Sequence, residues 1–372
     1  MQQRVLITGG AGFIGSHVAE ELLRAGYEVR ALDNLSPQVH GPGQRRPDYL
    51  ADDVELVIGD VRDRDAVRRA LDGVDAVFHF AAIVGVGQSM YEIERYTDVN
   101  NRGTSVLLEA LIERPVAKLV VASSMSVYGE GLYHGPDGNE IEAVDRTRDQ
   151  FTRGDWDVRG PDGERLTPAP TPETKRPALA SVYALSKYDQ ERLCLMVGDA
   201  YNIPATALRF FNVYGTRQAL SNPYTGVLAI FASRLLNGNA PTVFEDGEQR
   251  RDFVSVKDVA RACRLAMESP GAAGKVINIG SGHSYTIREI ATRMAGVLGK
   301  DYIAPEITGK YRVGDIRHCF ADVALARTVL GYEPRVAFDD GLSELASWLD
   351  GQSAEDHVAE ASEELAARGL TV

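Results

Sequence analysis

The sequence predicts an α/β fold in which a doubly wound parallel sheet is joined to a smaller α/β lobe. Over roughly the first two hundred residues, short β-branched runs alternate with segments whose apolar residues recur three and four positions apart. This alternation is typical of parallel strands covered by helices on both faces. From about residue 222, helical segments are mixed with short strands and Gly/Pro breaks, which indicates a second, smaller unit.

The predicted elements follow in chain order. The strands of the sheet are Arg4–Thr8, Glu28–Leu32, Val54–Ile58, Ala76–Phe80, Lys118–Ala122 and Thr206–Phe210. The helices between them include Ile14–Arg24, Asp63–Leu71 and Val182–Tyr201, and the smaller lobe has short strands at Val254 and Val276–Ile279. We therefore divide the chain into a first domain (1–215), a smaller lobe (216–350) and an acidic tail (351–372), which we expect to be a surface helix or a frayed end.

Residues 130–180 interrupt this pattern with a long insertion, which we call the flap. The segment is rich in Gly, Pro, Asp and Arg and lies where a compact α/β domain uses a short connection. It contains Gly-Pro-Asp-Gly twice, at Gly135–Gly138 and Gly160–Gly163, and each is a strong turn signal. One interpretation is a surface loop with two hairpin turns; the other is a flap on the substrate side or at an interface.

Composition and charge exclude several classes of protein. The formal net charge of -13 argues against a general affinity for nucleic acid. No segment approaches the roughly 20 apolar residues of a membrane helix. Cys194, Cys263 and Cys319 are far apart, so neither a disulfide framework nor a cysteine metal site is expected. The sequence thus predicts a cytoplasmic protein that binds no metal, nucleic acid or membrane.

A glycine cluster follows the first predicted strand and opens the first helix, with the sequence Gly-Gly-Ala-Gly-Phe-Ile-Gly at residues 9–15. There, glycines let backbone N–H groups approach a pyrophosphate, whose charge the helix N-terminus stabilises. Asp33 ends the second strand about 20 residues further on, where a carboxylate accepts both hydroxyls of an adenosine ribose and repels a 2′-phosphate. The sequence therefore predicts a Rossmann-type sheet that binds NAD rather than NADP.

Two further motifs predict the reacting centre. Ser123 and Ser124 end the fifth strand, while Tyr183 and Lys187 lie one turn apart on a predicted helix. A nearby ammonium favours phenolate, so we expect the pKa of Tyr183 to fall from about 10 toward neutrality. Tyr183 could then take a proton from a sugar hydroxyl held by Ser124 while hydride leaves the adjoining carbon. Alone, the Tyr–Lys pair would be a commonplace amphipathic pair; the glycine cluster and Asp33 favour a catalytic one.

Together these motifs resemble the extended short-chain dehydrogenase/reductases, specifically the NAD-dependent nucleotide-sugar epimerase/dehydratase family, over roughly residues 1–350. Besides the glycine cluster, the matching segments are Asp60-Val61, 79–82, 99–104, 123–129, 183–187, 209–215 and 251–254. The resemblance implies catalytic roles for Ser124, Tyr183 and Lys187, and a homodimer formed through the helices that contain Tyr91–Leu111 and Val182–Tyr201. The predicted NAD contacts are Gly9, Gly12, Phe13, Ile14, Asp33, Asn34, Asp60, Val61, Phe80, Ala81, Ala82, Asn100, Ser123, Tyr183, Lys187 and Phe210.

The resemblance also implies a nucleoside-diphosphate sugar as substrate. Asn212, Arg251 and Arg312 resemble the family's diphosphate-binding residues, and Asp315 its ribose-binding carboxylate. The two arginines could equally be surface ion pairs, although guanidinium geometry suits a diphosphate. Cys319 stands where related epimerases limit the pocket, so its small side chain predicts room for a bulky or unusual hexose. The predicted substrate contacts are Ser124, Ser126, Asn212, Arg251, Arg312, Asp315 and Cys319.

The residues after the catalytic serine bear on the reaction. Family members that eliminate water carry an Asp-Glu pair where this chain has Met125 and Ser126. Neither side chain can move the required protons, so the resemblance disfavours a 4,6-dehydratase. It predicts a 4-epimerase, which oxidises the sugar at C4 and returns the hydride to the other face. The alternatives are a net oxidoreductase, such as a 4-ketoreductase or sugar dehydrogenase, and a redox-sensing binding protein without catalysis.

Within the family, the flap and four short segments most closely resemble dTDP-L-rhamnose 4-epimerases, which form dTDP-6-deoxy-L-talose. The segments are 154–156, 171–173, 181–184 and 221–226. This favours a dTDP-hexose, dTDP-L-rhamnose or dTDP-6-deoxy-L-talose, as substrate, with UDP-glucuronate or a UDP-N-acetylhexosamine as alternatives. In that group the flap often holds zinc-ribbon cysteine pairs; here the two Gly-Pro-Asp-Gly turns take their place, which predicts a ribbon-like flap without metal.

Overall fold

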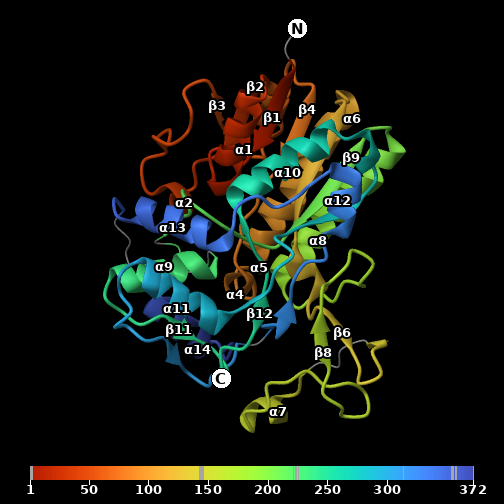
Figure 1. The fold of residues 1–372 in the computed structure, drawn as a ribbon. Helices are drawn as coiled ribbons and strands as arrows, with labels where there is room; N and C mark the ends of the chain where they lie inside the picture. Colours follow the sequence, from red (N-terminus) through yellow and green to blue (C-terminus); the bar gives the residue numbers. More distant parts are fainter. Residues whose placement is uncertain are drawn as a thin grey trace.

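The computed structural model describes residues 3–141, 146–220, 222, 224, 226–312, 314–352, 356 and 358–371. Its centre is a seven-stranded parallel sheet with the strand order β14-β9-β5-β4-β1-β2-β3 (Figure 1). The predicted Rossmann-type α/β fold is thereby confirmed. The strands are β1 (Arg4–Thr8), β2 (Glu28–Asp33), β3 (Glu55–Ile58), β4 (Ala76–His79), β5 (Lys118–Ser124), β9 (Ala205–Phe210) and β14 (Val276–Ile279).

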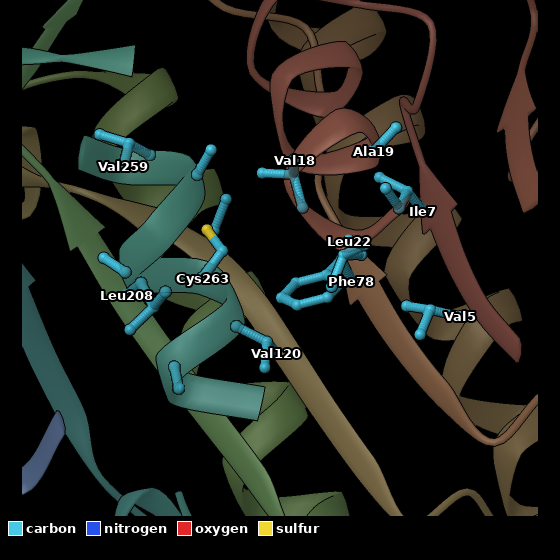
Figure 2. Close-up of a cluster of buried hydrophobic side chains, with 14 of the residues drawn as sticks. Val5, Ile7, Val18, Ala19, Leu22, Phe78, Val120, Leu208, Val259 and Cys263 are labelled. Carbon is cyan, nitrogen blue, oxygen red and sulfur yellow. The ribbon is translucent and has the colours of Figure 1, made fainter. Parts of the chain in front are cut away.

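Helices cover both faces of this sheet because its strands present apolar side chains to each side. In β1, Val5 and Ile7 point into one cluster and Leu6 into the other. Figure 2 shows the first cluster, in which side chains of α1 and α10 meet those of the central strands. Parallel sheets require this burial on two sides. The first face is covered by α1 (Phe13–Arg24), α10 (Val256–Glu268) and α12 (Ala324–Leu330), and the second by α3 (Arg64–Ala70), α6 (Gly103–Glu113) and α8 (Val182–Ala200).

One strand lies elsewhere than the sequence predicts. We assigned Val276–Ile279 to the smaller lobe, but it forms β14 and pairs in parallel with β9 at the edge of the large sheet. The chain leaves β9, builds part of the lobe and returns through α10 before it forms β14. Such a pairing joins residues that are distant in sequence, so a local pattern cannot show it. Part of the 216–350 segment therefore completes the sheet.

The second lobe has a core of its own, which includes the buried Phe231, Met294 and Leu342. Its helices are α9 (Val227–Leu236), α11 (Ile287–Val297) and α13 (Phe338–Leu349). Its short strands are β10 (Asn212–Tyr214), β11 (Thr242–Val243), β12 (Arg250–Arg251), β13 (Phe253–Ser255), β15 (Tyr285–Thr286), β16 (Glu306–Ile307) and β17 (His318–Cys319). The connecting segments contain α2 (Pro37–His40), α4 (Val86–Ser89), α5 (Ile93–Tyr96), a π-helix η1 (Thr97–Arg102), and the 3₁₀ turns η2 (Met125–Tyr128) and η3 (Pro270–Ala272).

The flap forms a small three-stranded sheet that projects from the body (Figure 1). Both Gly-Pro-Asp-Gly segments make the predicted tight turns, since the N–H groups of Gly138 and Gly163 bond the carbonyls of Gly135 and Gly160, each at 3.0 Å. Tyr133, buried with Val158 and Leu166, forms a separate small core. Residues 142–145 of the predicted flap lie outside the described residues. Its elements are β6 (Leu132–His134), β7 (Glu140–Ile141), α7 (Arg148–Thr152) and β8 (Thr167–Ala169).

The C-terminal segment contains the helix α14 (Val358–Ala367). We expected a surface helix or a frayed end, and the structure has a helix with an exposed side, as at Glu363, and a buried side, where Ala361 and Leu365 are each only 8% exposed. Over the described ranges of the chain, none of the helices combines the length and hydrophobicity needed to cross a membrane.

Candidate active site

A cavity of about 780 Å³ opens where the carboxyl ends of the sheet strands face the second lobe. Ligands of doubly wound sheets bind at this edge, because the strand-to-helix loops meet there. The cavity brings together most of the predicted site residues. They are Gly9, Gly12, Phe13, Ile14, Asp33, Asn34, Asp60, Val61, Phe80, Ala81, Ala82, Ser123, Ser124, Ser126, Tyr183, Lys187, Phe210, Asn212, Arg251, Arg312 and Asp315.

The glycine cluster has the geometry that a pyrophosphate site needs. Gly9 has a φ of 71°, and a Cβ there would lie 2.9 Å from the backbone nitrogen of Ala81. A Cβ at Gly15 would overlap the carbonyl oxygen of Gly9. Gly12 caps α1 without a side-chain hydrogen bond, so bare backbone at the helix N-terminus borders the cavity. Gly9 and Gly15 therefore cannot be replaced without a clash, and the N-terminal N–H groups of α1 favour a bound phosphate.

Asp33 holds the glycine cluster and borders the cavity at the same time. Its carboxylate accepts hydrogen bonds from the backbone N–H groups of Ala11 (3.0 Å) and Leu35 (2.9 Å). The Nε2 atom of His40 lies 3.7 Å from the same carboxylate, and His40 also lines the cavity. Asp33 was predictable from its spacing, whereas His40 comes from a short helix that carries no motif.

Asp60 is held in its charged form beside the end of β3. Hydrogen bonds from Arg62 are the main cause that lowers the pKa of Asp60 to about 2. The guanidinium nitrogen of Arg62 lies 2.8 Å from the Asp60 carboxylate, and the side-chain amide of Asn34 donates to it at 3.1 Å. Arg62 lines the cavity too and was missed, because the predicted contacts end at Val61.

The reacting centre lies where β5 ends and α8 begins. Ser181 caps α8 by accepting a hydrogen bond from the backbone of Ala184 (3.1 Å), which places Tyr183 in the first turn. Tyr183 and Ser124 both line the cavity, and Ser124 is the hydrogen-bonding neighbour that lowers the pKa of Tyr183. Ser124 Oγ also accepts a hydrogen bond from the Ser126 hydroxyl at 2.9 Å, so its own proton is available to Tyr183. The structure thus brings the predicted base and the predicted catalytic serine to one part of the cavity.

The electrostatics of Tyr183 differ from the expectation. Burial raises the pKa of Tyr183 above its ordinary value, and the hydrogen bond with Ser124 offsets only part of this shift. The Lys187 ammonium donates to the side chain of Gln190 at 2.7 Å. Burial lowers the pKa of Lys187 to about 8. The expected fall in the Tyr183 pKa is therefore corrected: burial dominates, and one helical turn of separation did not reveal where the Lys187 side chain points.

Two buried residues that follow Lys187 support this centre, and sequence reasoning missed both. Gln190 accepts from Lys187 and donates to Thr104 Oγ1 at 2.8 Å. Glu191 accepts from Ser123 Oγ at 2.7 Å and forms a two-point ion pair with Arg209 (2.7 and 2.9 Å). Both could have been predicted from helical spacing, because positions three and four after Lys187 lie on the same buried face of the helix.

Two predicted contacts do not line the cavity. Asn100 is fully buried in η1, where its side chain bonds the backbone N–H (2.8 Å) and carbonyl (3.1 Å) of Ile83. It therefore positions the loop after β4. Cys319 is 1% exposed in β17 and faces Thr171, with 3.8 Å between its Sγ and the Thr171 hydroxyl. The prediction that Cys319 sets the size of the sugar pocket therefore has no support in its placement.

The substrate half of the cavity contains the two predicted phosphate-binding arginines. Arg312 pairs with Asp315 at 2.9 Å, and its guanidinium lies 4.7 Å from the centre of the Phe244 ring. Arg251 donates to backbone carbonyls, including those of Arg250 and Arg317 at 2.9 Å each. Asn212 borders the same region, and within the described chain its buried Oδ1 has no hydrogen-bond partner. These groups supply donors and positive charge suited to a diphosphate.

The flap packs directly behind this substrate half. The ring of Phe151 stacks on Tyr311, next to Arg312, with 4.1 Å between ring centres. Arg146 is buried, pairs with Glu245 at 2.8 Å and donates to the carbonyl of Asp315 at 3.1 Å. Of the two interpretations of the flap, this contact favours the substrate-side one.

Acidic side chains are scarce around the reacting centre. Among the described residues that line the cavity, the carboxylates are Asp33, Asp60 and Asp315. The first two border the glycine cluster, in the part of the cavity predicted to bind NAD, which we call the nucleotide half. The third is paired with Arg312. Met125 and Ser126, which follow Ser124, both line the cavity. In this part of the chain, no carboxylic acid stands where an elimination of water would need one.

The family of the chain is shown by comparison with known proteins. The model of the NAD dependent epimerase/dehydratase family matches residues 5–151 and 158–280. The chain belongs to this family. It is an NAD-dependent enzyme of the epimerase type, and NAD is its cofactor. The glycine cluster, Asp33 and the open N-terminus of α1 fit this dinucleotide.

Individual relatives agree over nearly the whole chain. The dTDP-L-rhamnose 4-epimerase of Burkholderia thailandensis is 35% identical over 353 residues, which cover 93% of this chain and 95% of the relative. The crystal structure of UDP-glucose 4-epimerase from Thermotoga maritima with UDP-glucose has a TM-score of 0.76 and 32% identity, covering 94% of this chain and 99% of that one. UDP-glucuronic acid 4-epimerase from Bacillus cereus, in complex with UDP-glucuronic acid and NAD, has a TM-score of 0.75 and 27% identity, covering 94% and 99%.

The sequence predicts that the chain binds no metal, and this remains a prediction. In the described ranges, no group of three or more His, Cys, Asp or Glu residues is arranged to hold a metal ion.

Proposed function

We propose that this enzyme is a nucleotide-sugar 4-epimerase that works through a transient 4-keto sugar. The observation that carries the proposal is that Ser124, Tyr183 and Lys187 line one cavity, whose described lining has no carboxylate directly after Ser124, where Met125 and Ser126 stand. This set can remove and return one proton of an alcohol. It lacks the second acid and base that dehydration needs, so an isomerisation fits better than an elimination.

The chain's own residues handle the proton. Ser124 holds the C4 hydroxyl of the sugar, and Tyr183 accepts the proton of that hydroxyl. In the free protein burial controls the pKa of Tyr183, and the Lys187 ammonium is bonded to Gln190. The positive charge of Lys187 would favour the phenolate once cofactor and sugar close the site. NAD, when bound, accepts hydride from C4 and gives it back. After the 4-keto sugar has rotated to present its other face, Tyr183 returns the proton. The product is an isomer of the substrate, with no net oxidation.

A turnover experiment separates this proposal from a net oxidoreductase. The purified protein is mixed with a dTDP-sugar without added nicotinamide, and the product is followed by NMR and mass. An epimerase forms many equivalents of an isomer of unchanged mass on its bound NAD. A 4-ketoreductase or sugar dehydrogenase stops after one equivalent, and that result refutes the proposal.

We further propose dTDP-L-rhamnose and dTDP-6-deoxy-L-talose as the favoured pair of substrate and product. The support is the relative from Burkholderia thailandensis together with the flap. The diphosphate would meet Arg251, Arg312 and Asn212. A panel that includes UDP-glucose, UDP-glucuronate and a UDP-N-acetylhexosamine tests the choice, because a higher kcat/KM on any UDP-sugar contradicts it.

The expectation of a homodimer has support in one exposed face of α8. Leu185 and Met196 are 46% and 52% exposed, and three turns of the helix separate them, so they share a side. Apolar side chains at such a face suit a contact with a second copy. Light scattering on the wild type and on Met196→Glu tests it, with a dimer in the first and a shift toward monomer in the second. The cytoplasmic location remains a prediction from the sequence.

A further inference from the structure

The helix α14 carries an apolar stripe that faces the cavity. Val358, Ala361 and Leu365 are spaced three and four residues apart, so they lie on one side of the helix. All three line the cavity, together with Leu370 just beyond the helix. By contrast, Glu363 is exposed. The helix is amphipathic, and its buried side forms part of the cavity wall.

The short helix α4 contacts both this stripe and the backbone of Tyr183. A Cβ on Gly87, in α4, would stand 3.3 Å from a methyl group of Leu365. The same short helix reaches the base, because the hydroxyl of Ser89 accepts a hydrogen bond from the backbone N–H of Tyr183 at 3.0 Å. A single turn of helix therefore connects the surface under Leu365 to the residue that moves the proton.

Polar contacts hold the C-terminal segment in place at three positions. Asp356 accepts hydrogen bonds from Asn239 (2.8 Å) and Arg234 (3.3 Å). The guanidinium of Arg368 lies 4.2 Å from the centre of the Tyr91 ring. Near the end of the chain, Thr371 forms a β-bridge with Arg312, the predicted phosphate-binding arginine. The segment thus runs from α9 past α4 to the diphosphate end of the cavity.

The cavity wall around Leu365 is apolar. The C-terminal segment contributes Val358, Ala361, Leu365 and Leu370 to the lining, and Leu365 lies against Gly87. The nearby cation Arg95 is already bonded to Glu92 (2.6 Å) and to Gln38 (2.9 Å). A carboxylate or hydroxyl pressed against this wall would lose its hydration without gaining a partner, whereas a methyl group would gain from burial.

We propose that α14 is the outer wall of the sugar site and that Leu365 is a specificity-determining residue, favouring a nucleotide sugar with a methyl group at C6. The inference rests on the proposed function and extends it to the substrate class. It assigns a binding role to the segment after residue 350, where the resemblance to the family ends.

A matched pair of sugars tests this on the full-length holoenzyme. dTDP-L-rhamnose and dTDP-L-mannose differ only by a hydroxyl at C6. We expect the wild type to favour the deoxy sugar by roughly 10- to 100-fold in kcat/KM. Leu365→Ser should reduce that ratio toward one with unchanged bound NAD. Leu365→Met and the exposed control Glu363→Ala should keep the wild-type ratio.

The outcomes are distinguishable. Equal kcat/KM on the two sugars in the wild type, or an unchanged ratio in Leu365→Ser, overturns the role of Leu365 while the epimerase stands. The role is also overturned if Leu365→Met lowers the preference for the deoxy sugar as much as Leu365→Ser does. An apolar side chain at this position would then not explain the preference. Absence of turnover on both sugars in the wild type overturns the proposed substrate pair and this inference with it, and absence of turnover on the UDP-sugar panel as well overturns the epimerase.

Discussion

The two halves of the cavity are built in different ways. The nucleotide half comes from consecutive strand ends of one sheet, and its polar groups are fixed by near neighbours, such as Asp33 on Ala11 and Asp60 on Arg62. The substrate half is assembled from remote pieces: the lobe, the flap and α14. There, Arg146 of the flap donates to the carbonyl of Asp315 in the lobe. The comparison teaches that cofactor binding depends on the sheet. Sugar recognition depends on the lobe, the flap and α14, whose residues can change while the sheet stays the same.

The largest expected effect comes from the point where the two halves meet. Tyr183→Phe removes the hydroxyl that takes the proton but keeps the ring in place. We expect kcat to fall by about 10²- to 10⁴-fold, as for loss of a general base, while bound NAD is unchanged. Product formation by NMR and nicotinamide released on denaturation measure the two quantities.

Tyr188→Phe is the matched control for this change, since Tyr188 lies on the same helix and outside the cavity lining. It should retain wild-type kcat. A Tyr183→Phe variant with an unaffected rate would exclude Tyr183 as the base.

The second effect should be confined to the substrate half. Arg312→Ala removes a charged partner of the diphosphate, and a charge-assisted hydrogen bond contributes roughly 1.5–3 kcal/mol. We therefore expect KM for the nucleotide sugar to rise by about 10- to 100-fold, with bound NAD unchanged. Steady-state kinetics and cofactor content measure this. The exposed Arg327→Ala in α12 should change neither value, and a loss of NAD in Arg312→Ala would contradict the separation of the halves.

What the sequence predicted follows the same division. The glycine cluster, Asp33 and the strand-end serines were identified because each role depends on local spacing and on the end of a strand. The position of β14 was not, because its pairing with β9 joins distant segments. Cys319 was assigned to the sugar pocket by family position, yet its side chain turns toward Thr171.

Side-chain direction accounts for most of the remaining differences. Helical spacing placed Lys187 beside Tyr183, but only the fold shows that its ammonium bonds Gln190. The contact of Arg146 with the Asp315 carbonyl links residues that share no motif. The apolar spacing of α14 is present in the sequence but was not used for a prediction, because the cavity that it faces is formed only by tertiary packing.

The third prediction concerns pH. The pKa of Lys187 is lowered to about 8 by burial, so kcat should fall as the pH rises past that value and Lys187 loses its charge. Gln190→Glu puts a carboxylate where the ammonium donates, which raises the pKa of Lys187 and moves this limb to higher pH by about one unit. Profiles of kcat against pH measure the shift.

Gln190→Met is the control, because it removes the acceptor without adding charge and should not move the limb upward. The lowered pKa of Lys187 also fixes how its contribution to stability depends on pH. Between about pH 8 and 10.5, Lys187 keeps its proton in the unfolded chain and has lost it in the folded one. The contribution of Lys187 to the free energy of unfolding therefore increases with pH in this range. A limb that stays in place in Gln190→Glu would show that another group controls it.

The smallest effect should come from the flap, the most remote part of the substrate half. Phe151→Ala removes the ring that stacks on Tyr311, and such aromatic pairs contribute about 0.5–1.5 kcal/mol beyond burial. Because Tyr311 precedes Arg312, we expect a roughly 2- to 10-fold rise in KM for the nucleotide sugar, with NAD content and kcat nearly unchanged. Arg153→Ala, exposed at the end of the same short helix α7, is the control. If Phe151→Ala lowered NAD content instead, the flap would belong to both halves, and the division between a fixed cofactor site and an assembled sugar site would not hold.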